Sequence, residues 1–380
     1  MKRNLLLTPG PTQVPPRLCE ALGRPIIHHR TPQFQEYLRD VIDGLKYVLR
    51  TTNDIYLMAS SGTGAMEACV CSLLSPGDTV ITVEAGKFGE RWTELCKAYQ
   101  VNPQVVAVPW GKSVDPSVIK HLLKENPSIK AVFITLCETS TGTTPDIEAI
   151  GKAVQETNAV LVVDAISGLG VIDFKTDAWH VDAVASASHK GLMLPPGVAF
   201  VSLSPKAQKL MEQSRCPKFY FDLRKYQAVA AKPDTPFTPA IGIIIALAES
   251  LRMIKEEGLE KMFARYERLA QGLCAAVKAM DLEVFPEESA RSNVLTAIKI
   301  PPAIDGGKVV KMMRDIHGIS VAGGQGDLKG KIVRIAHMGC LDEYDLLTGI
   351  SCFEKVLKEL GHSFKLGAGV AAAQRYFNEG

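Results

Sequence analysis

The sequence has no long hydrophobic run and no block of charge of one sign. Its longest apolar stretches, such as Ile241 to Ala248, are far shorter than the roughly 20 residues of a membrane-spanning helix. The 43 basic and 41 acidic residues of this 380-residue chain are interspersed and leave a formal net charge of only +2. Without a basic stripe or a polybasic segment, we expect neither nucleic acid nor a membrane surface as a partner.

The sequence also lacks closely spaced cysteines and metal-binding histidine patterns. The nine cysteines are irregularly placed, none forms a Cys-x-x-Cys motif, and the closest pair is Cys69 and Cys71. Such spacing is typical of reduced, mostly buried thiols in a cytoplasmic protein. The eight histidines include only the adjacent pair His28 and His29, so we expect no metal site. Only three leucines follow Met1–Asn4, too few for a signal-peptide core, which also predicts a cytoplasmic location.

Hydrophobic residues make up 46% of the chain, enough for a sizeable core and two domains. In its first 200 or so residues, short apolar segments alternate with helical patterns. This alternation predicts an α/β fold with a mostly parallel, seven-stranded sheet covered by helices on both faces. The expected strands are Ile55–Ala59, Thr79–Val83, Gln104–Val108, Ala131–Leu136, Ala159–Val163, Ala183–Ser186 and Val198–Ser202.

The second half of the chain follows a different pattern. A polar, proline-punctuated loop at 215–239 precedes a long helical stretch, 241–280, in which Gly258 marks a joint. An alternating strand and helix region then predicts a smaller α+β domain, and the tail from Lys365 predicts an extra helix. We therefore divide the chain into three parts: an N-terminal arm (1–17), a large domain (18–260) and a small C-terminal domain with a helical tail (261–380).

Two neighbouring strands are followed by residues that can do chemistry. The strand Ala159–Val163 ends in Asp164, and the strand Ala183–Ser186 leads into Lys190. Because open α/β sheets bind ligands at the carboxyl ends of their strands, an acid and an amine would meet there. The pair suits pyridoxal phosphate, since a lysine can hold its aldehyde as a Schiff base and an acid can keep its ring nitrogen protonated. The alternative is a surface lysine and a helix-capping aspartate; the paired strands favour the cofactor.

A loop of small residues, Ser60-Ser61-Gly62-Thr63-Gly64, connects a strand to a helical pattern that starts at Ala65. Small residues let the backbone approach a phosphate, and a helix N-terminus offers free N–H groups. The hydroxyls of Ser61 and Thr63 would add donors. Taken alone, the loop fits a simple capped turn equally well. It lacks the Gly-x-Gly-x-x-Gly order of a dinucleotide-binding fingerprint.

Phosphate loop, acid and lysine follow one another in the order found in fold type I, the aspartate-aminotransferase-like fold of pyridoxal-phosphate enzymes. The chain resembles a class V aminotransferase of the alanine–glyoxylate or serine–pyruvate type, from Thr8-Pro9-Gly10-Pro11 as far as Gly339. The tail after about His362 falls outside the resemblance. The resemblance implies a homodimeric, pyridoxal 5'-phosphate-dependent enzyme that transfers an amino group from alanine or serine to glyoxylate or pyruvate.

The resemblance also implies roles for single residues. Lys190 would carry the cofactor and move a proton, while Asp164 would pair with the pyridine nitrogen. Phe88 would stack on the ring, where most relatives have tryptophan. Arg334 would bind the substrate carboxylate, with Gly10 close to it. The other implied cofactor contacts are Ser61, Gly62, Thr63, Thr139, His189 and, from the neighbouring subunit, Thr238.

Some features leave other functions open. His189 stands where aminotransferases commonly have glutamine, and histidine there is familiar from cysteine desulfurases; Cys340 is then the candidate nucleophile, although nothing around it predicts a low pKa. A class V scaffold can also serve as a non-catalytic subunit of a larger assembly. Aspartate, phosphoserine, ureidoglycine and aminoethylphosphonate remain open as donors. A second anionic group would need a further cation, for which Arg30 is the candidate, although a role at a dimer interface suits Arg30 equally well.

Overall fold

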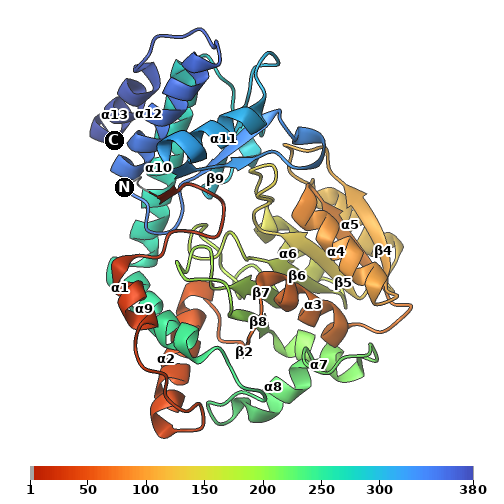
Figure 1. Ribbon diagram of the computed structural model, residues 1–380. Helices are drawn as coiled ribbons and strands as arrows, with labels where there is room; N and C mark the ends of the chain where they lie inside the picture. Colours follow the sequence, from red (N-terminus) through yellow and green to blue (C-terminus); the bar gives the residue numbers. More distant parts are fainter. Residues whose placement is uncertain (1–3, 380) are drawn as a thin grey trace.

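The computed structural model describes residues 4–379, and its largest element is a seven-stranded sheet (Figure 1). The strand order is β2-β8-β7-β6-β5-β3-β4, with β8 antiparallel to both of its neighbours and the other pairs parallel. The strands are β2 (Asp54–Met58), β3 (Thr79–Glu84), β4 (Asn102–Ala107), β5 (Ala131–Thr135), β6 (Val160–Asp164), β7 (Ala183–Ala187) and β8 (Ala199–Leu203). All seven predicted strands are present, so the predicted α/β fold is confirmed.

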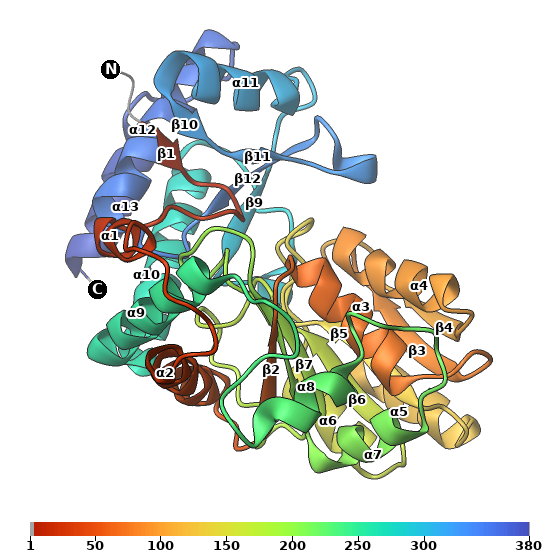
Figure 2. The same ribbon diagram turned by 60° about the horizontal axis from the view of Figure 1, so that its bottom comes forward.

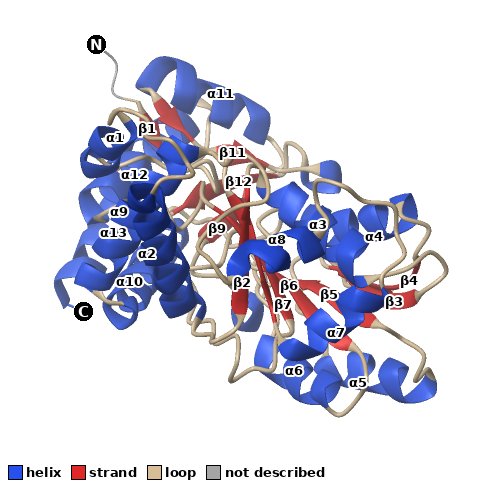
Figure 3. Ribbon diagram, turned by 90° about the horizontal axis from the view of Figure 1, so that it is seen from below, coloured by secondary structure: helices blue, strands red, loops and turns tan. Residues whose placement is uncertain are grey.

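Helices cover both faces of this sheet (Figure 3). The side chains of Val132 and Ile134 on β5 pack into one hydrophobic cluster, and those of Ala131 and Phe133 pack into another on the opposite face. This alternation explains why β5 to β8 are buried along their whole length. One cluster includes α2 (Pro32–Leu49), α5 (Pro116–Glu125), α6 (Ile147–Gln155) and α9 (Ile241–Glu257); the other includes α3 (Gly62–Leu73), α4 (Lys87–Ala98), α7 (Pro205–Gln213) and α8 (Leu223–Ala230).

The C-terminal part contains a second, antiparallel sheet in the order β11-β12-β9. Its strands are β9 (Leu295–Lys299), β11 (Ala322–Gly323) and β12 (Ile332–Ala336), and its helices are α10 (Leu259–Ala279), α11 (Gly306–His317), α12 (Glu343–Glu359) and α13 (Ala368–Glu379). Gly258, with φ +83°, separates α9 from α10 as predicted. The predicted tail helix is also present as α13, which packs on α10 where Gly272 leaves room for the ring of Phe377.

The N-terminal segment is anchored at both of its ends. The strand β1 (Leu5–Leu6) pairs in parallel with β10 (Ile319–Ser320), as Figure 2 shows, and buried Leu5 and Leu7 join the hydrophobic cluster of the C-terminal part. The chain then passes the residues around Lys190 and enters α1 (Pro16–Leu22). The first three residues of the predicted arm lie outside the described residues, and the division into three parts stays a prediction.

The structure also tests two expectations from the composition, namely unpaired cysteines and the lack of a membrane-spanning helix. All nine cysteines lie within the described residues and are unpaired; Cys69, Cys71, Cys96, Cys137 and Cys216 are buried. The prediction of unpaired, mostly buried thiols is therefore confirmed. No helix among residues 4–379 combines the length and the apolar character needed to cross a membrane.

Candidate active site

Asp164 and Lys190 lie at the carboxyl ends of two adjacent parallel strands. Asp164 is the last residue of β6 and pairs in register with Ala185 of β7, and Lys190 follows three residues after β7 ends. Both side chains are buried, with 3% and 9% of the residue surface exposed. The Asp164 carboxylate accepts a hydrogen bond from the Ile166 N–H at 2.8 Å. The structure thus brings the predicted acid and amine to one edge of the sheet.

Burial shifts the pKa of both groups toward neutrality. It raises the pKa of Asp164 to about 7, against the opposing effects of the Ile166 N–H and the nearby Arg91 and Lys190. It lowers the pKa of Lys190 to about 8, although the Asp164 carboxylate acts in the opposite direction. A lysine with a pKa near 8 is partly neutral at neutral pH, which is the form that can accept a proton from a substrate.

The N-terminal segment closes over Lys190. The Lys190 ammonium donates to the Pro9 carbonyl, and the Thr12 hydroxyl donates to the Lys190 carbonyl at 2.9 Å. Gly10 has φ +121°, and a Cβ there would lie 2.3 Å from Lys190 Nζ, so no larger residue fits without displacing the lysine. The structure therefore places Gly10 directly against the predicted catalytic amine.

The small-residue loop forms the N-terminus of α3, which begins at Gly62 and not at Ala65 as predicted. Gly62 and Thr63 therefore lie in the first turn, and Ser61 is the N-cap residue. The prediction failed because glycine and threonine are weak helix formers, a local preference that tertiary packing overrides. A Cβ at Gly62 would lie 2.4 Å from the side chain of Ile166, just beyond Asp164. The exposed Ser61 side chain makes no capping hydrogen bond, which leaves its hydroxyl and the first N–H groups of α3 available to an anion.

Phe88 is the second residue of α4 and lies beside a buried carboxylate that was not predicted from the sequence. Glu138, which is 2% exposed, accepts the N–H groups of Phe88 and Gly89 at 2.9 Å each. Its other oxygen accepts the Ser140 N–H at 3.0 Å and the Ser140 hydroxyl at 2.5 Å. Burial raises the pKa of Glu138, and these hydrogen bonds oppose that shift. A glutamate directly after an apolar strand, in a turn of small polar residues, was the signal that could have identified it.

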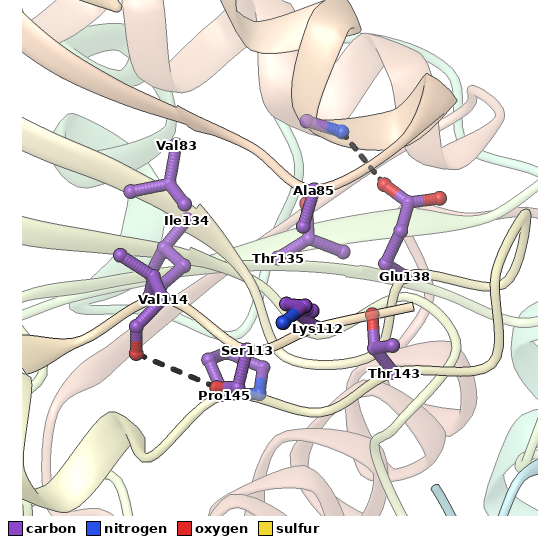
Figure 4. Close-up of a pocket in the computed structure, with 11 residues that line it drawn as sticks. Val83, Ala85, Lys112, Ser113, Val114, Ile134, Thr135, Glu138, Thr143 and Pro145 are labelled. Atoms are coloured by element: carbon purple, nitrogen blue, oxygen red, sulfur yellow. Dashed lines mark hydrogen bonds between the residues drawn. The ribbon is translucent and has the colours of Figure 1, made fainter. Parts of the chain in front are cut away.

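A cavity of about 10 Å³ lies against this turn (Figure 4). Its lining includes Glu138, Thr135, Thr143 and Lys112, and Figure 4 shows one oxygen of Glu138 bonded to a backbone nitrogen of α4. Such a volume is about that of a single water molecule. This cavity is therefore part of the packing around Glu138 and does not hold a cofactor.

Arg334 joins the second sheet to the turn that contains Glu138. Its Nε donates to the Gly323 carbonyl at 2.9 Å, and its Nη1 donates to the Thr139 carbonyl at 2.6 Å. Arg334 is 5% exposed, and burial lowers its pKa to about 10 against the opposing charge of Glu138. Even so, the guanidinium stays protonated at neutral pH and could bind a carboxylate. Predicted residues Thr139 and Arg334, far apart in sequence, are thus in direct contact.

The remaining predicted residues lie in two environments. His189 is partly buried beside Lys190, and its Nδ1 has no hydrogen-bond partner within the described residues. Burial and the neighbouring Lys190 charge lower the pKa of His189 to about 4, so its imidazole is neutral. Thr238 is exposed on the loop before α9. Arg30 donates to the Asp234 carboxylate and, at 2.9 Å, to the Thr235 carbonyl, which ties it to that same loop.

Residues 6–334 match the profile of the family described as Aminotransferase class-V. The chain belongs to this family. The resemblance inferred from the sequence motifs is therefore confirmed, and the enzyme class is that of the transaminases.

Individual relatives are similar to this protein over nearly its whole length. A protein of a Synechococcus strain named soluble hydrogenase, small subunit, is 43% identical, with 98% of each chain covered. The L-aspartate–glyoxylate aminotransferase of Paracoccus denitrificans is 37% identical, with 99% of this chain and 97% of the relative covered. The crystal structure of ureidoglycine–glyoxylate aminotransferase from Bacillus subtilis superimposes with a TM-score of 0.95 at 29% identity, covering 100% of this chain and 99% of that one.

The side chains of this class V aminotransferase fit pyridoxal phosphate. An uncapped helix N-terminus with two hydroxyl residues suits a phosphate group, and the buried His189 Nδ1 has no partner of its own. Burial raises the pKa of Asp164 because too little positive charge lies near its carboxylate to offset this effect. A cationic ring nitrogen would supply that missing charge. Lys190, three residues past the end of β7, supplies the amine.

Proposed function

We propose that this protein is a pyridoxal 5'-phosphate-dependent aminotransferase that transfers the amino group of alanine or serine to glyoxylate or pyruvate. The observation that carries the proposal is the buried pair Asp164 and Lys190 at adjacent strand ends, with Arg334 close enough for its charge to lower the pKa of Lys190. Two of the similar proteins are named for glyoxylate as a substrate, together with different donors, which supports glyoxylate as the acceptor.

Bound pyridoxal phosphate would supply an electron sink for the negative charge left on the substrate Cα when its proton is removed. Asp164 would hold a proton on the ring nitrogen, and Phe88 would lie against the ring. Thr139 would contact the cofactor near the ring oxygen. The phosphate would be bound by Ser61, Gly62, Thr63 and His189, and by Thr238 of the partner subunit.

Two side chains would act on the substrate itself. Lys190 would take the proton from Cα and return it during the transfer, which its lowered pKa favours. Arg334 would bind the carboxylate of the amino donor and then that of the keto acceptor in a ping-pong sequence. Gly10 has no side chain to fill the space beside Lys190 Nζ. A small substrate would fit in this narrow space.

We also propose a cytoplasmic homodimer made of an N-terminal arm (1–17), a large cofactor-binding domain (18–260) and a small C-terminal domain with its helical tail (261–380). The buried hydrophobic side chains of α11, α12 and α13 form a cluster separate from those of the large sheet, which supports this division. Exposed Thr238 follows Phe237 in the chain, and the Phe237 ring centre lies 5.9 Å from that of Phe219, which is 71% exposed. An exposed aromatic side chain packed on the neighbour of Thr238 supports a subunit contact at this loop.

The two alternative functions have unequal support. For a desulfurase, Cys340 would have to be a reactive thiolate, but burial raises its pKa and its thiol donates to the Gln13 carbonyl at 3.5 Å. The non-catalytic subunit has one specific observation in its favour, the name of the hydrogenase subunit from Synechococcus. Both alternatives predict different outcomes in one experiment.

The test is an absorbance scan of the purified protein with stepwise addition of substrates. We expect a visible band from lysine-linked cofactor that alanine or serine bleaches and glyoxylate or pyruvate restores. Lys190→Ala should lower kcat at least about a thousandfold, whereas Lys97→Ala, at the exposed end of α4, should not. Full activity of Lys190→Ala would refute the assignment. Sulfide release from cysteine alone would indicate a desulfurase, and a colourless protein that cannot be reconstituted would indicate a non-catalytic subunit.

A further inference from the structure

Arg91 lies one helical turn after Phe88 on α4 and points toward the start of α3. Its Nη1 donates to the Thr63 hydroxyl at 3.2 Å, and its guanidinium carbon lies 4.9 Å from the centre of the Phe88 ring. Both partners are uncharged. No ion pair joins Arg91 to a carboxylate within residues 4–379.

The surroundings of Arg91 are electrostatically unbalanced. The N-terminus of α3 carries a partial positive charge, and its N-cap residue Ser61 makes no capping hydrogen bond. A guanidinium held against the first turn of that helix adds a full positive charge. The Arg91 charge also extends to the strand ends, where it lowers the pKa of both Asp164 and Lys190. Two positive groups that face each other in this way favour an anion between them.

We propose that Arg91 is a further ligand of the cofactor phosphate. This inference rests on the proposed function, because it assigns a residue to the phosphate site of the same cofactor. A planar guanidinium can form two parallel hydrogen bonds with phosphate oxygens, as can few other side chains. The contact with Thr63 is the reason to choose the phosphate, since Thr63 lies in the first turn of α3. Phe88 and Arg91, one turn apart on α4, would then contact the ring and the phosphate of one molecule.

A second carboxylate on the substrate is the competing ligand for Arg91. Arg30, the cation named from the sequence for such a group, is paired with Asp234. Arg91 therefore becomes the alternative cation for a dicarboxylate donor such as aspartate. The two roles differ in what the removal of Arg91 would change: cofactor affinity in one case, and the KM of dicarboxylate donors in the other.

The test compares two forms of the cofactor on the cofactor-free full-length protein. Pyridoxal phosphate and pyridoxal, which lacks the phosphate, are titrated by absorbance into wild type, Arg91→Met and Arg91→Lys. We expect Arg91→Met to weaken binding of pyridoxal phosphate by about tenfold to hundredfold and binding of pyridoxal much less, since only the loss of the charge near Lys190 affects both forms. Arg91→Lys should lose less, because it keeps the charge but not the planar fork. Lys97→Met on the same helix is the matched control and should bind both forms like wild type.

Several results would overturn the inference. An equal loss for both forms would mean that Arg91 acts only by holding Phe88 in place. Unchanged cofactor affinity with a raised KM for aspartate, but not for alanine, would assign Arg91 to the substrate. If Arg91→Met does not fold, the two cofactor forms are compared on Arg91→Lys instead. Inorganic phosphate is then tested as a competitor of pyridoxal phosphate on wild type and on Arg91→Lys. Failure of the proposed function is distinguishable, because wild type itself would then bind no pyridoxal phosphate.

Discussion

At the scale of single residues, Arg334 connects two distant parts of the chain and would also bind substrate. Its carbonyl partners, Gly323 and Thr139, already hold the guanidinium in place. A lysine keeps the charge but cannot keep both contacts or grip a carboxylate with two hydrogen bonds. We expect Arg334→Lys to raise the KM of both donor and acceptor by about tenfold to hundredfold. Steady-state kinetics with each substrate varied in turn measure this, and unchanged KM values would place the carboxylate anchor elsewhere.

Asp164 gives a prediction about pH. Burial raises its pKa from 3.8 to about 7, so between these values the folded protein keeps a proton that the unfolded chain has released. The contribution of Asp164 to stability therefore falls as pH rises from about 4 to about 7. We expect Asp164→Asn to be more stable than wild type at pH 7 by up to roughly 4 kcal/mol in the cofactor-free protein, and nearly equal at pH 4. Urea unfolding across this pH range checks it, and a pH-independent difference would contradict it.

At the scale of secondary-structure elements, the turn at Glu138 fixes the start of α4. Both carboxylate oxygens of Glu138 accept hydrogen bonds from buried donors. An amide has only one accepting oxygen, so Glu138→Gln would leave buried N–H groups facing an NH₂ group. We expect a loss of roughly 2–4 kcal/mol in the free energy of unfolding.

The matched control for this turn is Glu90→Gln. Glu90 lies on α4, pairs with Lys87 and has 29% of its side chain exposed. Such an ion pair contributes little, so the change should cost at most about 1 kcal/mol. Urea unfolding of both variants provides the comparison. Equal small effects would show that the carboxylate of Glu138 is not needed to hold the turn.

At the scale of the whole molecule, a shared active site would let two defective variants complement each other. In the proposed dimer, Lys190 of one subunit would work with Thr238 of the partner subunit. We expect Thr238→Val to weaken cofactor binding about tenfold. After mixed refolding with Lys190→Ala, half of the sites in a heterodimer would regain both residues, and activity at limiting cofactor should exceed the mean of the separate variants. Strictly additive activity would show that each site uses residues of one chain.

The sequence by itself determined the large sheet and the two predicted catalytic residues, Asp164 and Lys190, at the carboxyl ends of its strands. The central strands β5 to β8 were predictable because segments buried on both faces are apolar along most of their length, as β5 and β6 show. Asp164 is the last residue of one such strand and Lys190 comes three residues after another, so their position at the carboxyl edge follows from local order. The tail helix and the joint at Gly258 were local patterns too.

Only the tertiary structure decided which distant residues meet. Glu138 under α4, Arg91 on Thr63 and Arg334 on Thr139 join segments whose distance depends on how helices and sheets pack. The start of α3 at Gly62 is a similar case, because packing overrides weak helix propensity. The pKa shifts of Asp164 and Lys190 also needed the fold, since they result mainly from burial. Local order along the chain encodes strands and their ends, whereas contacts and burial exist only once the chain has packed.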